Sequence, residues 1–358
     1  MPSLSPYNGA KAEATLKAAV LTGAQRVEVR EFPDPTPGPG EVLIRVRACG
    51  ICGTDLHAYR GELPLATGVP LGHEMAGEIA ALGEGVHGFS VGEAVTVEPL
   101  KVCRNCPYCL SGQLHLCPSR ILLGTFLPGG MAQWIAAPSY SLYRLPPGMD
   151  YSLAALAEPL AVTVHALHLV GLRAGERVLV IGSGSVGLMA ILAARAAGAQ
   201  VASTFRYPQQ EVAARGLGAE ATYQDNEAGL ARLRQDAAKE PFDVVVEAVG
   251  GRGATLQLAM EMARPGGRIA VLGLFLSPVP VGGLLLTLKE VQLVGALTYC
   301  RPPAVSDFQV ALRILSQHQE DARHLISHQF PLEEADRAFA AAQDKNSGAL
   351  KVQVLPWG

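Results

Sequence analysis

The sequence contains few charged residues, and neither sign of charge predominates. Asp, Glu, Lys and Arg account for 17% of the 358 residues, and the formal net charge is −3. A chain this close to neutrality shows no electrostatic attraction to nucleic acids or to acidic membranes. We therefore expect a small-molecule substrate, and neither nucleic acid nor a membrane as a partner.

Long apolar runs are also missing. No run reaches the roughly 18 residues that a membrane-spanning helix needs. Residues 1–17 contain Pro, Gly, Lys and Glu in place of the apolar core of a secretory signal. These absences predict a cytoplasmic protein. The seven cysteines, an odd number, then favour reduced thiols and a metal over disulfide bonds.

Four of these cysteines have the spacing Cys-x2-Cys-x2-Cys-x7-Cys. Four thiolates at such intervals can surround one tetrahedral zinc ion and leave no position for water or substrate, as in a structural site. Zinc binding then orders a loop that has little core of its own. An iron–sulfur cluster also uses four cysteines, but this spacing suits a zinc lobe better. We place the lobe at about residues 101–120, give His115 no ligand role, and expect the ligands Cys103, Cys106, Cys109 and Cys117.

The order of strand and helix patterns predicts an α/β protein of two domains. Residues 17–143 contain short apolar strands separated by Pro and Gly, whereas strands and helices alternate after residue 177. Such alternation predicts a parallel, doubly wound sheet with helices on both faces. We expect residues 302–358 to return to the first domain. The predicted domains are 1–154 with 298–358, and 155–297. Predicted strands are 41–48, 75–83, 91–97, 177–181, 200–204, 243–247, 268–272, 291–294 and 350–355; predicted helices are 152–169, 186–197, 209–217, 254–263, 306–316 and 332–343.

A glycine motif between a predicted strand and a predicted helix indicates a dinucleotide site. The motif is Gly-x-Gly-x-x-Gly, in the context that it requires. Its glycines allow a tight turn, close approach of a pyrophosphate and close packing of helix on strand, and the helix N-terminus favours the phosphates. The alternative is a glycine-rich turn without a ligand. The expected cofactor contacts are Gly182, Gly184, Ser185, Val186 and Gly187, with Gly273 after a later strand.

The end of the second strand of this unit favours NADP over NAD. An acidic residue there would bind the ribose 2′-hydroxyl of NAD, but the sequence has Phe205 followed by Arg206. A guanidinium can pair with a 2′-phosphate. The alternative is that Arg206 is a solvated cation and that the protein accepts both cofactors.

A second group of metal-binding residue types is dispersed along the chain. Cys52, Thr54 and His57 follow the strand 41–48, and the pair His73-Glu74 comes later. Glu158 lies in a Glu-Pro segment far downstream. A catalytic zinc needs three protein ligands and one open position. Spacing alone does not show that these residues meet, and each can have an ordinary packing or capping role, as we expect of Cys49 and Cys300.

Several stretches together resemble the zinc-containing medium-chain alcohol dehydrogenase family, and its polyol branch in particular. They are residues 49–57, 72–78, 103–117, 157–162 and 182–187. The resemblance implies a GroES-like β-barrel catalytic domain beside a Rossmann domain, and two zinc ions, one catalytic and one structural. It implies that Cys52 and His73 bind the catalytic zinc. Glu74 and Glu158 lie where members of the family have one carboxylate that binds the zinc directly and another that acts through water or from an outer position. The sequence does not show which of the two binds directly.

The resemblance also implies a reaction. Zinc acidifies a substrate hydroxyl, and hydride passes from the substrate carbon to the nicotinamide. Thr54 takes the proton and passes it by the nicotinamide ribose to His57. The family further implies a homodimer or homotetramer, with the apolar run 281–288 at an interface or in the cleft, and substrate contacts near residues 123–130.

We therefore expect an NADP(H)-dependent oxidoreductase for a secondary alcohol, polyol or amino alcohol and its ketone. One alternative is a reductive biosynthetic enzyme for a bulkier aldehyde or ketone. Another is a non-catalytic NADPH-binding sensor on the same fold, although a sensor has no need of an open metal site. A zinc-free, quinone-reductase-like protein would lack the four-cysteine lobe.

Overall fold

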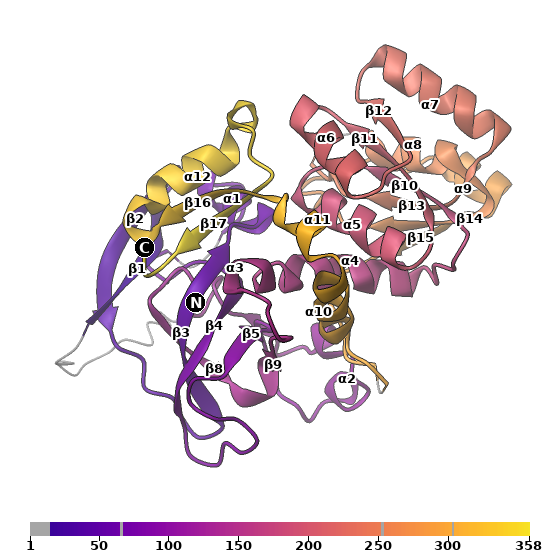
Figure 1. Cartoon of the computed structure of the whole chain (residues 1–358). Helices are drawn as coiled ribbons and strands as arrows, with labels where there is room; N and C mark the ends of the chain where they lie inside the picture. Colours follow the sequence, from indigo (N-terminus) through magenta and orange to yellow (C-terminus); the bar gives the residue numbers. More distant parts are fainter. Residues whose placement is uncertain (1–14, 65–66, 252–253, 303) are drawn as a thin grey trace.

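The computed structural model describes residues 15–64, 67–251, 254–302 and 304–358. Figure 1 shows two bodies: the early and last parts of the chain form one, and the middle of the chain forms the other. Residues 1–14, where the first predicted domain begins, lie outside the described residues.

The first body is built on a seven-stranded sheet with the order β16-β17-β3-β4-β5-β9, in which β8 also pairs with β3. Strand β3 lies in the middle of this sheet, where it pairs with β17, β4 and β8. Every second residue of β3 faces the core, so Val42, Ile44, Val46 and Ala48 are all buried. A hairpin, β1–β2, and a short pair, β6–β7, complete this body. The bounds are β1 Thr15–Gly23, β2 Arg26–Pro33, β3 Glu41–Gly50, β4 Glu74–Leu82, β5 Ala94–Val97, β6 Leu100–Lys101, β7 Ile121–Leu122, β8 Trp134–Pro138, β9 Leu142–Arg144, β16 Ile326–Pro331 and β17 Lys351–Leu355, with helices α1 Gly53–Tyr59, α2 Pro107–Leu110, α10 Asp307–Gln317, α11 Gln319–Arg323 and α12 Ala335–Gln343.

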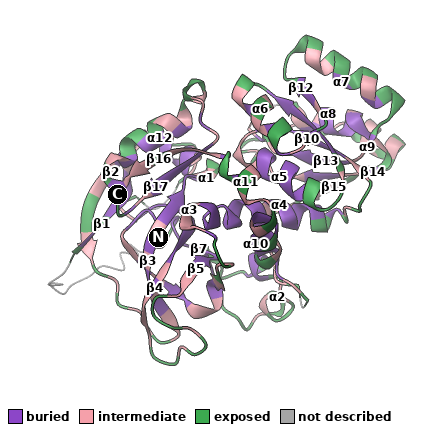
Figure 2. Ribbon diagram, viewed as in Figure 1, coloured by how far each residue is buried: buried purple, intermediate pink, exposed green. Residues whose placement is uncertain are grey.

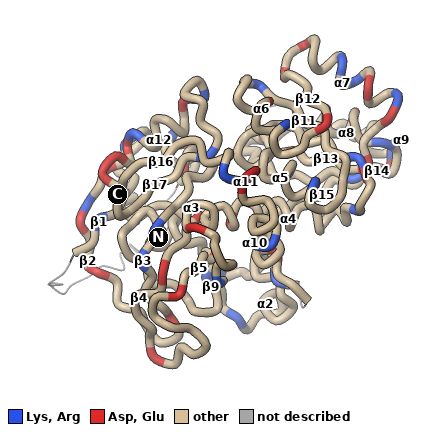
Figure 3. The backbone as a smooth tube through the Cα atoms, in the orientation of Figure 1, with Lys and Arg blue, Asp and Glu red and all other residues tan. Residues whose placement is uncertain are grey.

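The second body is a six-stranded parallel sheet with the order β12-β11-β10-β13-β14-β15, as the strand–helix alternation predicted. Its strands read as apolar runs because helices cover both faces. The sequence patterns did not predict one whole unit, β12 and α7, because α7 is mostly polar and its apolar stripe is narrow. Acidic and basic residues are interspersed along α7 (Figure 3). The bounds are β10 Arg177–Ile181, α5 Ser185–Ala196, β11 Gln200–Phe205, α6 Pro208–Gly216, β12 Ala221–Gln224, α7 Glu227–Lys239, β13 Phe242–Glu247, α8 Thr255–Met262, β14 Ala263–Val271, α9 Gly283–Lys289 and β15 Gln292–Gly295.

The helical stretch Tyr151–Leu169 connects the two bodies and corrects two predictions. The predicted single helix is two, α3 (Tyr151–Ala154) and α4 (Ala157–Leu169). Contrary to the expectation from apolar runs, the 19 residues together are long and apolar enough to cross a membrane by length and composition. However, 78% of the stretch is buried inside the protein, where α4 packs on α5, α10, β4 and β14 (Figure 2).

Candidate active site and metal centres

The turn after β3 positions the first candidate ligand. Cys52 is the N-cap of α1, and its backbone N–H donates to Asp55 Oδ2 at 2.9 Å. Its Sγ lies 3.9 Å from Thr54 Oγ1. Gly50 must be glycine, because an added Cβ would lie 2.0 Å from Glu74 Oε2 on the paired strand β4. The β3–β4 pairing therefore brings the two distant segments of the motif together.

Three of the dispersed residues meet. Ligand atoms of Cys52, His73 and Glu74 all lie within 4.8 Å of one another, and His73 and Glu74 are buried. His73 Nδ1 has no hydrogen-bond partner among the described residues, although Asp55 Oδ1 lies 3.9 Å away. A thiolate, a carboxylate and an imidazole whose ring nitrogen is free form a donor set that suits zinc.

Negative charge accumulates around this set. Burial lowers the pKa of His73, but Cys52, Asp55 and Glu158 outweigh it and raise the pKa well above its ordinary value. Burial, with the negative charge of Glu74, raises the pKa of Glu158 to about 7. Glu158 belongs to α4 and interacts with His73 from that side, but it does not join the three residues that lie within 4.8 Å. A divalent cation would relieve this repulsion.

A buried lysine contacts Glu74 from behind. Lys351 Nζ lies 2.7 and 2.8 Å from the two Glu74 carboxylate oxygens and donates to Ile51 O at 3.2 Å. Carboxylates that bind metals are commonly held by such an outer hydrogen bond. The sequence carries one signal for this contact, a lysine at the start of strand β17, whose other residues except Gln353 are apolar.

The two residues of the predicted proton path lie one turn apart on α1, and at this spacing Thr54 and His57 share a helix face. His57 Nδ1 lies 2.6 Å from Glu62 Oε2 and 2.9 Å from an Arg60 guanidinium nitrogen. Arg60 and His57 together lower the pKa of Glu62 to about 2. His57 is thus partly exposed and lies next to a carboxylate that is ionised at neutral pH.

The four cysteines of the lobe converge as a second group. Ligand atoms of Cys103, Cys106, Cys109 and Cys117 all lie within 4.8 Å of one another. Cys103 Sγ is 3.6 Å from Cys117 Sγ, and Cys109 N–H donates to Cys106 Sγ at 3.4 Å. Four sulfurs at these distances fit one tetrahedral zinc ion.

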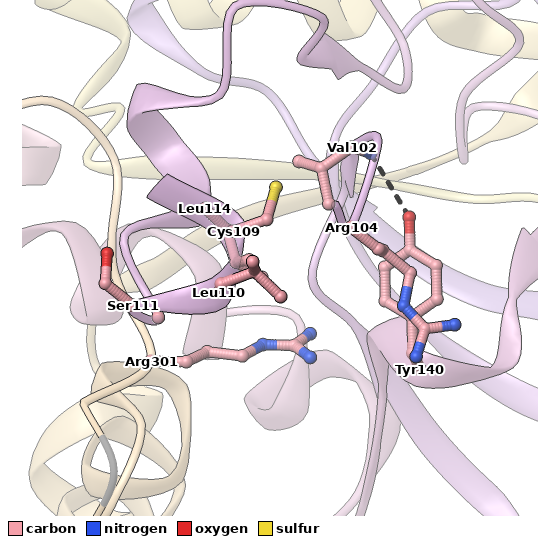
Figure 4. A pocket seen from close by; sticks show the side chains of 9 residues that line it. Val102, Arg104, Cys109, Leu110, Ser111, Leu114, Tyr140 and Arg301 are labelled. Carbon is pink, nitrogen blue, oxygen red and sulfur yellow. Dashed lines mark hydrogen bonds between the residues drawn. The ribbon is translucent and has the colours of Figure 1, made fainter. Parts of the chain in front are cut away.

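A cavity of about 470 Å³ lies beside the lobe (Figure 4), and neither Cys52 nor His73 lines it. Val102 N–H donates to Tyr140 Oη at 3.2 Å at one side of it. The cavity is therefore separate from the site of Cys52, His73 and Glu74. Its lining is Val102, Arg104, Cys109, Leu110, Ser111, Gly112, Leu114, Tyr140 and Arg301.

The glycine motif has the geometry of a phosphate-binding turn. Gly182 has φ +94°, and a Cβ on Gly187 would lie 1.7 Å from Gly182 O, so both positions require glycine for the fold itself. A Cβ on Gly184 would meet no atom within 4 Å, so the chain alone does not require glycine there. The open space at Gly184, and the buried Ser185 Oγ without a partner among described residues, fit an anionic ligand at the N-terminus of α5.

Two carboxylates of this body were not anticipated. Glu247, buried at the end of β13, accepts from Val249 N–H and Gly250 N–H, and a Cβ on Gly273 would lie 2.3 Å from its second oxygen. Asp225, after β12, accepts two hydrogen bonds from Arg206, at 3.1 and 2.6 Å. The guanidinium of Arg206, which we expected to contact a 2′-phosphate, is thus paired with Asp225 from the unit β12–α7, which the sequence patterns did not predict. Phe205 itself is buried.

Comparisons with known proteins support one relationship over nearly the whole chain. The model of the alcohol dehydrogenase GroES-like domain matches residues 38–147, and that of the zinc-binding dehydrogenase matches residues 185–317. The sorbitol dehydrogenase of Halalkalibacterium halodurans is 36% identical and is aligned over 95% of this chain and 99% of its own length. Alcohol dehydrogenase TADH from Thermus sp. ATN1 is 33% identical with a TM-score of 0.83, over 95% and 99% of the two chains. A zinc-binding dehydrogenase from Sinorhizobium meliloti 1021, solved with NADP, is 30% identical with a TM-score of 0.85, over 96% and 100%.

Proposed function

The chain belongs to the zinc-containing medium-chain alcohol dehydrogenase family, with its GroES-like and Rossmann domains, and on this premise we propose that it transfers hydride between NADP(H) and a secondary alcohol, polyol or amino alcohol and the corresponding ketone. The family makes it an alcohol or polyol dehydrogenase that works with zinc and a nicotinamide cofactor. The observation that carries the proposal is the approach of Cys52, His73 and Glu74 within 4.8 Å. A sensor without catalysis would not need these three donors.

We assign the catalytic zinc to Cys52, His73 and Glu74. Distance favours Glu74 over Glu158 as the third ligand, and Lys351 supports that carboxylate from outside. When bound, zinc supplies a Lewis acid that lowers the pKa of a substrate hydroxyl. Glu158 interacts electrostatically with His73 and Glu74, and with its raised pKa it can accept or donate a hydrogen bond.

The chain's own residues move the proton. Thr54 Oγ1 lies beside Cys52 Sγ, where it can accept the proton of the substrate hydroxyl. His57, one turn further and partly exposed, can pass a proton to solvent. Glu62 and Arg60 hold the imidazole in place. In the oxidative direction the alcohol loses this proton and one hydride, and the products are the ketone and NADPH.

Cofactor choice follows from the end of β11. At the position where an acid would repel a 2′-phosphate, this chain has Phe205. The relative from Sinorhizobium meliloti was solved with NADP. Arg206 Nη1 is not used in the pair with Asp225 and can contact a 2′-phosphate. We therefore propose a preference for NADP, reduced in strength by Asp225.

We further propose a homodimer through the edge of the parallel sheet. Strand β15 is the last strand of that sheet, and an unpaired edge can pair with a second copy. In α9, the helix that precedes β15 in the chain, Leu284 and Leu288 are 75% and 73% exposed. Apolar residues at such exposure favour an interface over the cleft for the run 281–288. Leu284→Glu with Leu288→Glu should produce a monomer in light scattering, whereas an unchanged mass would contradict this interface.

The test of the function is a substrate panel with both cofactors. Polyols, amino alcohols, sugar acids and the matching ketones are assayed by nicotinamide absorbance, and zinc is measured in the same samples. Cys52→Ser should abolish turnover and release the catalytic zinc. The control is Cys49→Ser, because Cys49 is buried nearby but stands outside the ligand group. Turnover that survives Cys52→Ser would refute the assignment, and larger kcat/KM for reduction of bulky carbonyls would favour the reductive alternative.

A further inference from the structure

A third group of metal-binding side chains lies outside both sites described above. Ligand atoms of His165, Cys300 and Asp307 all lie within 4.8 Å of one another. The three residues come from separate segments: α4, the segment after β15, and the first residue of α10. His165 and Asp307 are 1% and 0% exposed. Neither the catalytic role nor the four-cysteine lobe uses this group.

Hydrogen bonds fix the Asp307 carboxylate in the way that is common for carboxylates that bind metals. It accepts hydrogen bonds from Cys300 N–H at 2.8 Å and from the Nδ1 atoms of His165 and His168 at 2.9 and 2.7 Å. Carboxylates that bind metals are in turn fixed by donors of this kind. The Cys300 N–H and His168 bonds can persist while Asp307 takes a metal on the side of His165.

Two buried ring nitrogens next to this group have no partner. His165 Nε2 and His115 Nδ1 make no hydrogen bond within the described residues, and the two rings meet edge to face with centroids 4.7 Å apart. A buried polar atom without a hydrogen-bond partner is unfavourable. The carboxylate pairing of Asp307 alone leaves both atoms unexplained.

We propose that His165 Nδ1, Cys300 Sγ and Asp307 bind a divalent transition metal, with zinc as the metal that their mixed nitrogen, sulfur and oxygen donors suit best. Binding releases the Cys300 thiol proton to solvent, and a thiolate–metal bond forms. The His165 ring proton moves from Nδ1 to Nε2, so the imidazole stays neutral while Nδ1 coordinates the metal.

The proposed site would join the four-cysteine lobe to the interdomain helix α4. His115 belongs to the lobe, and Arg301, next to Cys300, donates its N–H to Gly112 O of the lobe at 2.8 Å. Figure 4 shows Arg301 together with the lobe residues Cys109 and Ser111 around the shared cavity. On the other side of Cys300, Tyr299 is buried. Burial is the main cause that raises the pKa of the Tyr299 hydroxyl, and the negative charge of Glu158 is the second. A metal here would therefore fix a segment that reaches from the lobe toward Glu158.

Zinc analysis of the full-length protein tests the site. After saturation with zinc and desalting, the wild type should hold about three zinc ions per chain, and Cys300→Ser and Asp307→Asn should each hold about two. The matched control is His168→Gln, which removes a hydrogen bond to Asp307 but no proposed ligand and should keep the wild-type content. Circular dichroism verifies that each variant is folded.

Cobalt supplies an independent readout. Addition of Co²⁺ to protein whose catalytic and lobe sites are filled with zinc should produce a thiolate-to-cobalt absorption band that is absent in Cys300→Ser. Two zinc ions in the wild type and no new cobalt band would overturn the proposal. That result would leave the proposed dehydrogenase function intact, because the latter depends on zinc loss in Cys52→Ser.

Discussion

Lys351 and Glu74 form an ion pair in the interior of the protein, with Nζ at 2.7 and 2.8 Å from the two carboxylate oxygens and side-chain exposures of 2% and 0%. The pair connects the C-terminal strand β17 to the first residue of β4. It also places a positive charge directly behind a proposed zinc ligand.

Removal of this lysine should destabilise the metal-free protein most. Lys351→Met leaves Glu74 buried without its partner, a change that costs about 3–5 kcal/mol in comparable pairs. Zinc at the site would compensate the carboxylate, so the loss should be smaller in the zinc-loaded protein. Denaturant unfolding with and without chelator measures both values.

Lys101→Met is the control for that experiment, because Lys101 pairs with Glu41 at 3.1 Å with 49% of its side chain exposed. Such surface pairs contribute at most about 1 kcal/mol. An equal loss for Lys351→Met with and without zinc would argue that Glu74 does not face the metal.

Arg206 and Asp225 should tune cofactor choice in opposite directions. Arg206→Ala removes charge-assisted bonds to a 2′-phosphate and should reduce kcat/KM for NADP roughly tenfold to a hundredfold, with little effect on NAD. Asp225→Asn removes the negative charge that competes for the guanidinium and should increase the NADP-to-NAD ratio. Arg215→Ala is a suitable control, since Arg215 forms a similar pair with Glu211 on α6. Equal use of both cofactors by all four proteins would contradict the role of Arg206.

Glu62 should support proton release during alcohol oxidation. Its pKa is lowered to about 2 by Arg60 and His57, so it is ionised throughout the assay range. Its Oε2 lies 2.6 Å from His57 Nδ1 and orients the imidazole. A misplaced imidazole would pass the proton to solvent less efficiently.

Glu62→Gln keeps the size of the side chain but removes its charge and weakens the contact with His57, so kcat for alcohol oxidation should fall. Zinc content should stay unchanged. A kcat that is identical in Glu62→Gln and in His57→Ala to that of the wild type would remove His57 from the proton path.

The four-cysteine lobe should contribute stability and not chemistry. Cys109→Ser should lose one zinc ion per chain and lower Tm, because the lobe has few buried residues of its own to replace the metal. Ser111→Ala, in the same lobe and with an exposed hydroxyl, serves as the control. Retention of full zinc content by Cys109→Ser would contradict the assignment of the four sulfurs.

Local sequence patterns predicted those elements of the structure that neighbouring residues define. The alternation of β3, the glycine turn 182–187 and the spacing of the four cysteines each depend on a few consecutive residues, so the fold class and the lobe could be predicted. The same patterns failed for α7, whose apolar stripe is narrow, and for the stretch Tyr151–Leu169, which hydrophobicity alone does not assign to a protein core.

The sequence by itself thus determined the folding units and which residue types were available for chemistry. Only the tertiary structure decided which of these residues meet. Glu74 lies near Cys52 because β3 and β4 pair in one register, and Lys351 reaches Glu74 across 277 residues of chain. Asp225 reaches Arg206 because β11 and β12 are parallel neighbours. Contacts of this kind depend on strand order and burial, which no local spacing encodes.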